Sequence, residues 1–314
     1  MMILMGHFAA RDQETGIATT PDKVIYLTTA NIALVLFMFF SGYGLSLKSY
    51  NQVNLKREWL SRLKKIYPPL LFVGILYVVM CFLLPDTCTP EAVHNRKLPL
   101  LIHEYRVWDS GSITCFLEGL LGYKDWYVVC IIYFYTFFYL SQYIARKTKW
   151  NFTIILSVIM LVYWVAAYYI YSWPQAHFFR YPCAFMIGHL VAKHSKATFG
   201  KKEKITDLII LMVFIATVAF HGAMWVGFYL VAMVMICVAK LISCRYEAKH
   251  KSLLYILGIV SYFYYLSHGR ISYPLMYYLG IDDLLVWTIF TGLVSYGLWK
   301  LYGGIKSVIR IIRK

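Results

Sequence analysis

A succession of long apolar segments, separated by short polar connections, is the feature that most restricts what this chain can fold into. Most segments approach the length of about 20 residues that a helix needs to cross a bilayer. Few are amphipathic, so they suit helices that pack on all sides within a bundle. We therefore predict an all-α integral membrane protein, a bundle of about ten transmembrane helices that forms a single transmembrane domain over residues 1–314 with no soluble domain. The segments are residues 1–10, 24–47, 66–84, 126–145, 152–172, 178–193, 205–221, 223–242, 253–268 and 284–303.

The composition supports a membrane location and argues against nucleic-acid binding. Charged residues make up only 15% of the chain, whereas a soluble domain usually carries about a quarter. A net charge of +16 would suggest a nucleic-acid partner in a soluble protein. Here the basic residues lie in short loops between apolar segments, not among aromatic residues on a polar surface. We therefore expect membrane lipid, and no nucleic acid, as a partner.

Basic residues concentrate in every second loop. The basic loops follow the second, fourth, sixth and eighth segments, and the C-terminal tail is basic as well. Because cytoplasmic loops carry an excess of Lys and Arg, this alternation predicts ten crossings with both termini in the cytoplasm. The tail from Ile305 to Lys314 alternates apolar and basic residues at near-helical spacing, which predicts a surface extension of the last helix on anionic lipid.

The long loop over residues 85–125 is predicted to face the outside. Its two apolar patches, residues 98–102 and 113–121, are too short to span and would be re-entrant or lie in the interface. Cys88 and Cys115 lie in this loop and would pair only if it faces an oxidising space. The seven cysteines show no CxxC and no Cys/His spacing, so we expect no metal site.

The first apolar segment contains one titratable side chain, His7. A histidine within a membrane helix is a candidate functional residue, because titratable groups are costly in lipid. At about 1.5 Å per residue this segment covers only about half of a hydrocarbon core of about 30 Å. The predicted orientation then places His7 within about a turn of the outer boundary. We expect that the true start lies upstream of Met1, the alternative being an impaired form.

The most distinctive stretch of the second segment contains Ser41, Gly42, Tyr43 and Gly44. Small residues allow two membrane helices to approach closely, so these residues predict close packing near a site or plain helix packing. Ser41 lacks the strand–turn–helix setting of a nucleophile elbow, so we assign it no covalent chemistry.

Arg62 and Lys65 lie three residues apart, on one predicted helical face, just before Pro68. We expect Pro68 to break the helical pattern where the chain enters the membrane. Two cations at this place suit a phosphate-bearing ligand, with Arg supplying bidentate geometry. The alternative is that the basic loop only fixes the orientation of the chain.

Three further features lie on the predicted outer side. Trp126 and the tyrosine after it open the fourth segment, where an aromatic belt is expected. Arg180 lies near the outer mouth of a segment and faces a polar cavity or reaches out to the interface. Tyr265 and His268 are one turn apart at the end of the ninth segment. The remaining histidines near segment ends are interpreted as interfacial: His177, His189 and His221.

Taken in order, these features resemble the membrane-bound acyltransferase 3 family of bacteria, and the resemblance covers essentially the whole chain. The matching features are a first-helix histidine (His7), a Phe-Phe-x-Ser-Gly-Tyr type segment (Phe39 to Tyr43), a basic Arg-Leu-x-Arg-Ile-x-Pro type segment (Arg62 to Pro68), a Trp-Tyr pair (Trp126, Tyr127), an Arg ahead of a helix with a mid-helix Gly (Arg180, Gly188), and a late Ser-Tyr-x-x-Tyr-Leu-x-His (Ser261 to His268).

The resemblance implies transfer of an acyl group, usually acetyl, from cytoplasmic acyl-CoA to a hydroxyl of an extracytoplasmic or lipid-linked carbohydrate, in the bacterial plasma membrane. It implies acyl-CoA as donor substrate and no bound cofactor. His7 is then the candidate general base, because an alcohol needs a base to attack at neutral pH. Arg62 and Lys65 would hold CoA phosphates. The residues expected on the acceptor side, or stabilising the oxyanion, are Arg180, Tyr265 and His268; Ser41, Gly42, Tyr43 and Trp126 would pack near the site.

The chain departs from the family pattern in two places. Lys65 replaces the second Arg of the basic segment, which keeps the charge but loses the bidentate geometry. Family members also carry a basic residue about three helical turns before the histidine, whereas here only six residues precede His7.

Two other classes of function remain open at the level of the sequence. A secondary transporter or exporter of a polysaccharide precursor would also be a basic protein with many spans, but it would show internal repeat symmetry, and the hydropathy pattern shows none. A non-catalytic subunit that works with polysaccharide-assembly proteins is the other alternative.

Overall fold

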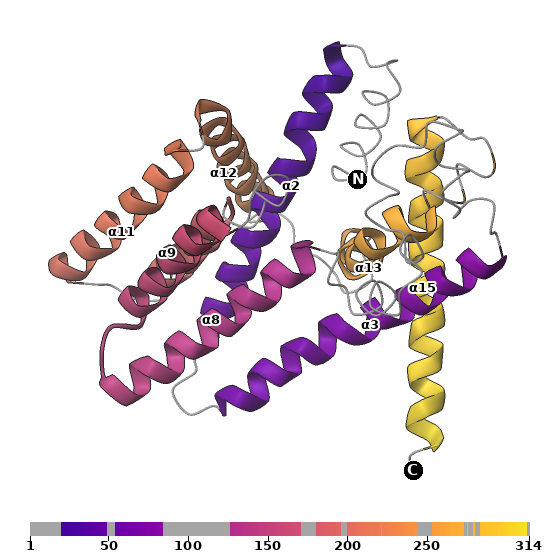
Figure 1. Cartoon of the computed structure of the whole chain (residues 1–314), viewed down its shortest axis with the longest axis horizontal. Coiled ribbons are helices and arrows are strands. Elements are labelled where there is room, and N and C mark those ends of the chain that lie inside the picture. Colours follow the sequence, from indigo (N-terminus) through magenta and orange to yellow (C-terminus); the bar gives the residue numbers. More distant parts are fainter. Residues whose placement is uncertain are drawn as a thin grey trace. The chain divides into compact units, whose positions relative to one another are not determined.

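The computed structural model describes residues 20–48, 54–83, 126–170, 180–195, 200–220, 222–243, 253–272, 275, 279 and 283–312. These residues are almost entirely helical and include no strand, which confirms the predicted all-α class for the described ranges (Figure 1). The described part of the chain has nine α-helices: α2 (Thr20–Ser46), α3 (Leu55–Leu83), α8 (Trp126–Thr148), α9 (Phe152–Ile170), α10 (Pro182–His194), α11 (Lys201–Phe220), α12 (Ala223–Ser243), α13 (Leu253–Ser267) and α15 (Leu284–Ile312). A π-helical turn, η2 (His268–Ser272), follows α13.

Two stretches within these helices are long and apolar enough to cross a membrane, Tyr127–Thr148 and Phe152–Tyr169. Asn31–Ser46 and Ala223–Val238 are shorter apolar helical stretches. The structure therefore agrees with an apolar helical protein, and two of the ten predicted crossings are matched by helical stretches long enough to span a membrane. The predicted segment 1–10 with His7, and the outer loop with Cys88 and Cys115, lie outside the described residues.

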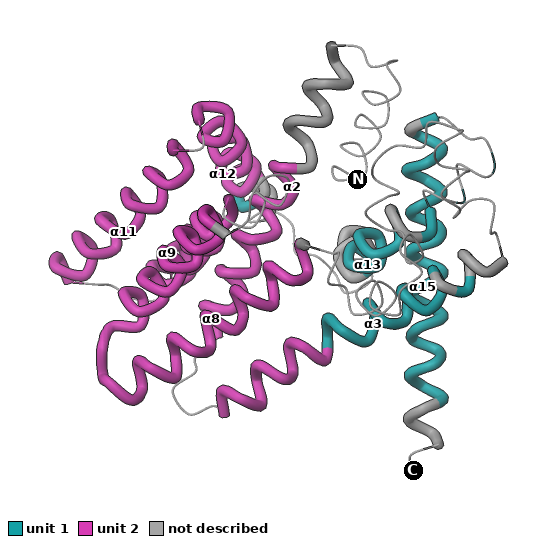
Figure 2. Tube along the Cα trace, viewed as in Figure 1, with its two compact units in different colours: residues 1–30, 65–125, 240–314 teal, residues 31–64, 126–239 magenta. Residues whose placement is uncertain are grey.

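The chain divides into two compact units (Figure 2). Unit 2 comprises residues 31–64 and 126–239, and unit 1 comprises residues 1–30, 65–125 and 240–314. The described helices of unit 2 are most of α2, the start of α3, and α8 to α12; those of unit 1 are the rest of α3, α13, η2 and α15.

Aromatic rings fill the centre of unit 2. Phe134 and Phe138 of α8 are fully buried, and the ring of Phe134 lies 5.3 Å from that of Phe185 on α10. The ring of Phe138 lies 5.1 Å from that of Phe152 on α9, in an edge-to-face arrangement that is favourable for aromatic pairs. A turn at residues 149–151 lets α8 pack on α9, and the Asn151 side chain accepts a hydrogen bond from the Thr153 amide (2.8 Å), which caps α9.

The helices around this core expose apolar side chains over their length. On α9 Val162 is 63% exposed, and α11 and α12 expose Met212 and Val234 to a similar degree. Exposed apolar surface on helices of this kind suits contact with lipid tails.

In unit 1, α13 and the C-terminal half of α15 pack around aromatic side chains. The Tyr302 ring lies 5.5 Å from Phe263 of α13 and 5.6 Å from Phe72 of α3. The predicted extension of the last helix is confirmed, because α15 continues to Ile312, well into the basic tail.

The expected break at Pro68 is wrong, because α3 continues from Leu55 to Leu83 through Pro68 and Pro69. A proline inside a helix removes a backbone donor and leaves a carbonyl short of its partner. The Tyr262 hydroxyl donates a hydrogen bond of 2.9 Å to the Ile66 carbonyl in this weakened turn. This bond joins α13 to α3 beside the prolines, but it does not replace the bonds that they remove, which belong to the carbonyls four residues before them, at Lys64 and Lys65.

The helix α10 is the shortest of the nine described helices, with 13 residues. Pro182 stands at its start, where the missing backbone donor costs nothing, and Lys193 and His194 lie in its last turn. At about 1.5 Å per residue, α10 is about 20 Å long.

Candidate functional site

The backbones of α2 and α10 touch within unit 2 at two glycines. A Cβ added to Gly42 would lie 2.1 Å from the Phe185 carbonyl oxygen, and one added to Gly188 would lie 2.1 Å from the Phe39 carbonyl oxygen. Only glycine fits at such distances. Gly42 therefore lies at the helix contact, whereas a Cβ added to Gly44 would meet nothing within 4 Å. Tyr43 is half-buried and stacks on the ring of Phe39 (6.0 Å, 12°).

Ser41 and Arg62, which belong to separate sequence motifs, both interact with Tyr135 of α8. The hydroxyls of Ser41 and Tyr135 share a hydrogen bond, and the Arg62 guanidinium acts electrostatically on Tyr135. One turn before Arg62, the Trp59 indole donates to the Thr136 hydroxyl (3.1 Å), which fixes the start of α3 on α8. Arg62 is half-buried in this position, whereas Lys65 on the same helix is exposed.

Tyr135 is therefore a residue that the sequence motifs miss. Nothing in its sequence neighbourhood distinguishes it, since it is one of 28 tyrosines and lies in a run of aromatic residues. Its hydroxyl can orient Arg62 and connect it to α2. The three helices α2, α3 and α8 thus bring Ser41, Tyr135 and Arg62 together.

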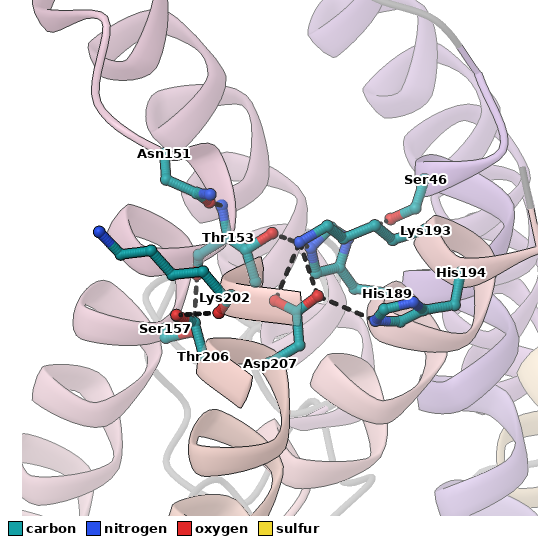
Figure 3. Close-up of polar contacts among 10 residues, drawn as sticks. All are labelled: Ser46, Asn151, Thr153, Ser157, His189, Lys193, His194, Lys202, Thr206 and Asp207. Atoms are coloured by element: carbon teal, nitrogen blue, oxygen red, sulfur yellow. Dashed lines mark hydrogen bonds and ion pairs between the residues drawn. The ribbon is translucent and has the colours of Figure 1, made fainter. Parts of the chain in front are cut away.

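His189 of α10 lies at the centre of a second polar group in unit 2 (Figure 3). Its Nδ1 is 2.8 Å from the Ser46 hydroxyl at the end of α2, and its Nε2 is 3.1 Å from the Thr153 hydroxyl on α9. The interfacial position expected for His189 is wrong, because the side chain is only 3% exposed. Its burial is tolerated because both ring nitrogens have hydroxyl partners.

Asp207 of α11 binds two side chains, Lys193 and His194, at the end of α10 (Figure 3). The Lys193 ammonium lies 2.9 and 2.7 Å from the two carboxylate oxygens, and His194 Nε2 lies 2.9 Å from Oδ2. Asp207 is 4% exposed, so these contacts compensate for burying its charge. One signal in the sequence was available, since Asp207 is an acidic residue within a predicted apolar segment.

Arg180 precedes α10 and is held against α12. Its guanidinium carbon lies 4.6 Å from the centroid of the Trp225 ring, within the range of a cation–π interaction. The Tyr229 hydroxyl donates to the Arg180 carbonyl (2.8 Å) and accepts from the Ala184 amide (3.2 Å). The half-buried Arg180 is thus placed at the N-terminal end of α10, opposite the Asp207 contacts at its C-terminal end.

Tyr265 and His268 lie together in unit 1. Their rings are 5.6 Å apart, and His268 Nδ1 is hydrogen-bonded to the Tyr265 carbonyl. Because a carbonyl only accepts, Nδ1 carries the proton, and the neutral ring has Nε2 as its acceptor. His268 is buried and begins the π-helical turn η2. Turns of this type occur frequently at functional sites.

The structure thus groups some of the predicted site residues and leaves others apart. Ser41, Gly42, Tyr43 and Arg62 belong to unit 2, as does Arg180, while Lys65, Tyr265 and His268 belong to unit 1. Trp126 begins α8, and His7 lies outside the described residues. Within the described ranges, no group of three or more His, Cys, Asp or Glu side chains is placed to hold a metal ion.

Comparison with known proteins identifies the family. Residues 1–299 match the acyltransferase 3 family model, which is described as an acyltransferase domain. Neither curated proteins nor solved structures gave a match. The family match covers almost the whole chain, including every residue of the motifs described above. The chain therefore belongs to the acyltransferase 3 family, the membrane acyltransferases that its sequence motifs resemble.

Proposed function

We propose that this acyltransferase transfers an acyl group, in the simplest case acetyl, from cytoplasmic acyl-CoA to a hydroxyl of an extracytoplasmic or lipid-linked carbohydrate. The observation that carries this proposal is the family match over residues 1–299, a range that includes both His7 and Arg62. The proposed location is the bacterial plasma membrane, with several crossings and both termini in the cytoplasm. The apolar helices and the alternation of basic loops support this location.

His7 is the proposed general base. It takes the proton from the acceptor hydroxyl while the oxygen attacks the thioester carbonyl, which gives a tetrahedral oxyanion. Collapse of this intermediate breaks the carbon–sulfur bond, and the departing CoA thiolate receives the proton from the imidazolium. The products are the O-acyl ester and free CoA, and no further reactant is needed.

Arg62 is the proposed principal contact to the CoA phosphates. A guanidinium binds phosphate through two parallel hydrogen bonds when its orientation is fixed. The electrostatic interaction with Tyr135, which is also hydrogen-bonded to Ser41, supports a fixed orientation for Arg62. Lys65 is exposed on the same helix and contributes as a second, less directional charge.

Arg180, Tyr265 and His268 are proposed for the acceptor side or for stabilising the oxyanion. The loop pattern predicts that all three lie toward the outer face of the membrane. His268 supports the acceptor-side role, because its Nδ1 donates to the Tyr265 carbonyl and its Nε2 can then accept a hydrogen bond from a hydroxyl of the acceptor.

The proposal is tested by giving labelled acetyl-CoA to membranes that contain the protein and measuring label in cell-surface polysaccharide. Wild type should transfer label, and His7→Ala should reduce transfer by about 100-fold or more, the usual contribution of a general base. His250→Ala is the matched control, since it removes a histidine from a predicted cytoplasmic loop. Equal labelling by wild type and His7→Ala would remove His7 from the mechanism, and no labelling by wild type would overturn the proposed reaction.

A further inference from the structure

We propose that Ser272 and Thr291 of unit 1 form a binding subsite for a hydroxyl group of the carbohydrate acceptor. The identity of the ligand rests on the proposed function, whereas the subsite itself rests on the packing of α13, η2 and α15. Neither residue belongs to the sequence motifs described above.

Two contacts establish how these elements align. The Phe263 ring lies 5.5 Å from the Tyr302 ring, and the Ser267 hydroxyl lies 2.9 Å from the Ser295 hydroxyl. As the residue number rises along α13, the number of its partner on α15 falls, so the two helices are antiparallel. The turn η2 continues beyond Ser267 and also contacts α15, on the side toward its N-terminus.

Ser267 and Ser295 form a buried polar pair in which the donor of each hydrogen bond can be assigned. The Ser295 hydroxyl donates to the Thr291 carbonyl (2.5 Å), so Ser267 donates to Ser295 (2.9 Å). Both side chains are fully buried. This pair therefore satisfies its own hydrogen bonds inside an apolar interior.

One turn farther along, Ser272 and Thr291 are placed in the same way but make no such pair. Thr291 precedes Ser295 by one α-helical turn, and Ser272 follows Ser267 by one π-helical turn, in which hydrogen bonds join residues five apart. Both side chains are fully buried, and within the described part of the chain neither hydroxyl has a hydrogen-bond partner.

Two buried hydroxyls without partners reduce the stability of the protein, because each has left water without a replacement bond. Such groups in a native structure call for an additional partner. Hydroxyls both donate and accept, and the hydroxyls of a carbohydrate can match them in both roles. His268, which opens η2 and is buried, adds an imidazole to the same segment.

The predicted orientation agrees with an acceptor ligand. The basic loop before α13 is predicted to be cytoplasmic, so α13 ends, and η2 begins, toward the outer face. An extracytoplasmic carbohydrate would approach from this side, and acyl-CoA would not.

The test uses the full-length protein in detergent and, as probe, polysaccharide extracted from cells that lack the gene. Adding the polysaccharide should raise the Tm of wild type, because a ligand that binds the native state stabilises it. Thr291→Val and Ser272→Ala should abolish this rise. In the transfer assay both variants should raise the KM for polysaccharide about tenfold, the loss expected for a hydrogen bond in a dry site, and leave the KM for acetyl-CoA unchanged.

The Tm without polysaccharide separates binding from a structural role. Thr291→Val removes a hydroxyl without a partner at nearly constant volume and should raise the Tm by about 2–4 °C. The matched control Ser295→Ala removes a hydroxyl that has partners and should lower the Tm while keeping the rise caused by polysaccharide.

Each outcome decides the inference. A rise in Tm caused by polysaccharide that depends on Thr291 supports the subsite even when no label is transferred, and in that case only the proposed reaction fails. If wild type shows no rise, or if Thr291→Val keeps it, the subsite is wrong. If Thr291→Val lowers the Tm without polysaccharide and leaves the KM for polysaccharide unchanged, the hydroxyl holds only a buried water or a structural contact, which also overturns the subsite.

Discussion

The His189 and Asp207 groups of unit 2 differ from the Ser272 and Thr291 hydroxyls of unit 1 in how completely their hydrogen bonds are satisfied. In unit 2, His189 has a hydroxyl at each ring nitrogen, and the Asp207 carboxylate has three contacts to Lys193 and His194. In unit 1, Ser272 and Thr291 are equally buried and have no hydrogen-bond partner within the described residues. Closed polar groups join helices, whereas open ones leave capacity for a ligand.

The comparison predicts that substitutions in the closed groups of unit 2 lower stability, whereas those in the open pair of unit 1 affect binding. Arg62 is the expected exception in unit 2, because its side chain is proposed to bind a substrate. The four predictions below test this division, starting with the largest expected effect.

Asp207→Ala should destabilise the protein by about 3–5 kcal/mol, because it leaves the largely buried Lys193 ammonium without its anion and removes the hydrogen-bond partner of His194. Thermal unfolding in detergent measures the effect. Glu203→Ala is the matched control, since Glu203 is one turn earlier on α11 and exposed. A similar Tm for the two variants would show that the Asp207 contacts do not hold α10 to α11.

Gly42→Ala should cost about 1–3 kcal/mol, because its new methyl group would meet the Phe185 backbone and force α2 away from α10. Gly44→Ala provides the comparison on the same helix. No atom lies within 4 Å of its added Cβ, so it should gain up to about 1 kcal/mol from better helix propensity. The two variants should therefore shift the unfolding temperature in opposite directions. If Gly44→Ala lowered it as much as Gly42→Ala, the close contact at Gly42 would be contradicted.

Arg62→Ala should raise the KM for acetyl-CoA about tenfold or more, because a charged hydrogen bond to phosphate is lost, and should leave the Tm nearly unchanged. Lys56→Ala is the control, since Lys56 is exposed on the same helix, and a change of about twofold or less is expected from a solvent-exposed charge. Initial rates at varied acetyl-CoA give both values. Equal changes in the KM for acetyl-CoA in the two variants would show that the basic segment only fixes the orientation of the chain in the membrane.

Tyr135→Phe should raise the KM for acetyl-CoA about threefold without changing kcat, since it removes only the hydroxyl that orients Arg62. The same change should have no effect when Arg62 is already alanine, which separates positioning from general damage. Tyr143→Phe, at an exposed tyrosine of the same helix, is the control. An unchanged effect in the Arg62→Ala background would show that Tyr135 acts by another route.

Helices with an uninterrupted apolar composition were predictable from the sequence almost to the residue. The predicted segments 152–172, 223–242 and 253–268 correspond to α9, α12 and α13. The predicted apolar segment starts at residue 66, later than α3, because the first turns of this helix are rich in basic residues and do not belong to an apolar run.

The site was less predictable than the fold, because its contacts join residues far apart in the sequence. The motifs pointed to Ser41 and Arg62 but not to Tyr135, which connects them. His189 resembled an interfacial histidine until Ser46 and Thr153 were brought to its two nitrogens. Ser272 and Thr291 could not be found from sequence, since isolated hydroxyl residues in apolar helices usually bond to their own backbone.

The length of α10 has a consequence for the path of the acyl group. Arg180 and Lys193 stand at opposite ends of a helix about 20 Å long, whereas the hydrocarbon core of a bilayer is about 30 Å thick. If α10 crosses the bilayer as the sequence predicts, the membrane beside it must thin locally to match its length. Beside α10, the two aqueous phases would be separated by about two thirds of the ordinary barrier. A donor held on one side would then have a shorter distance to an acceptor on the other.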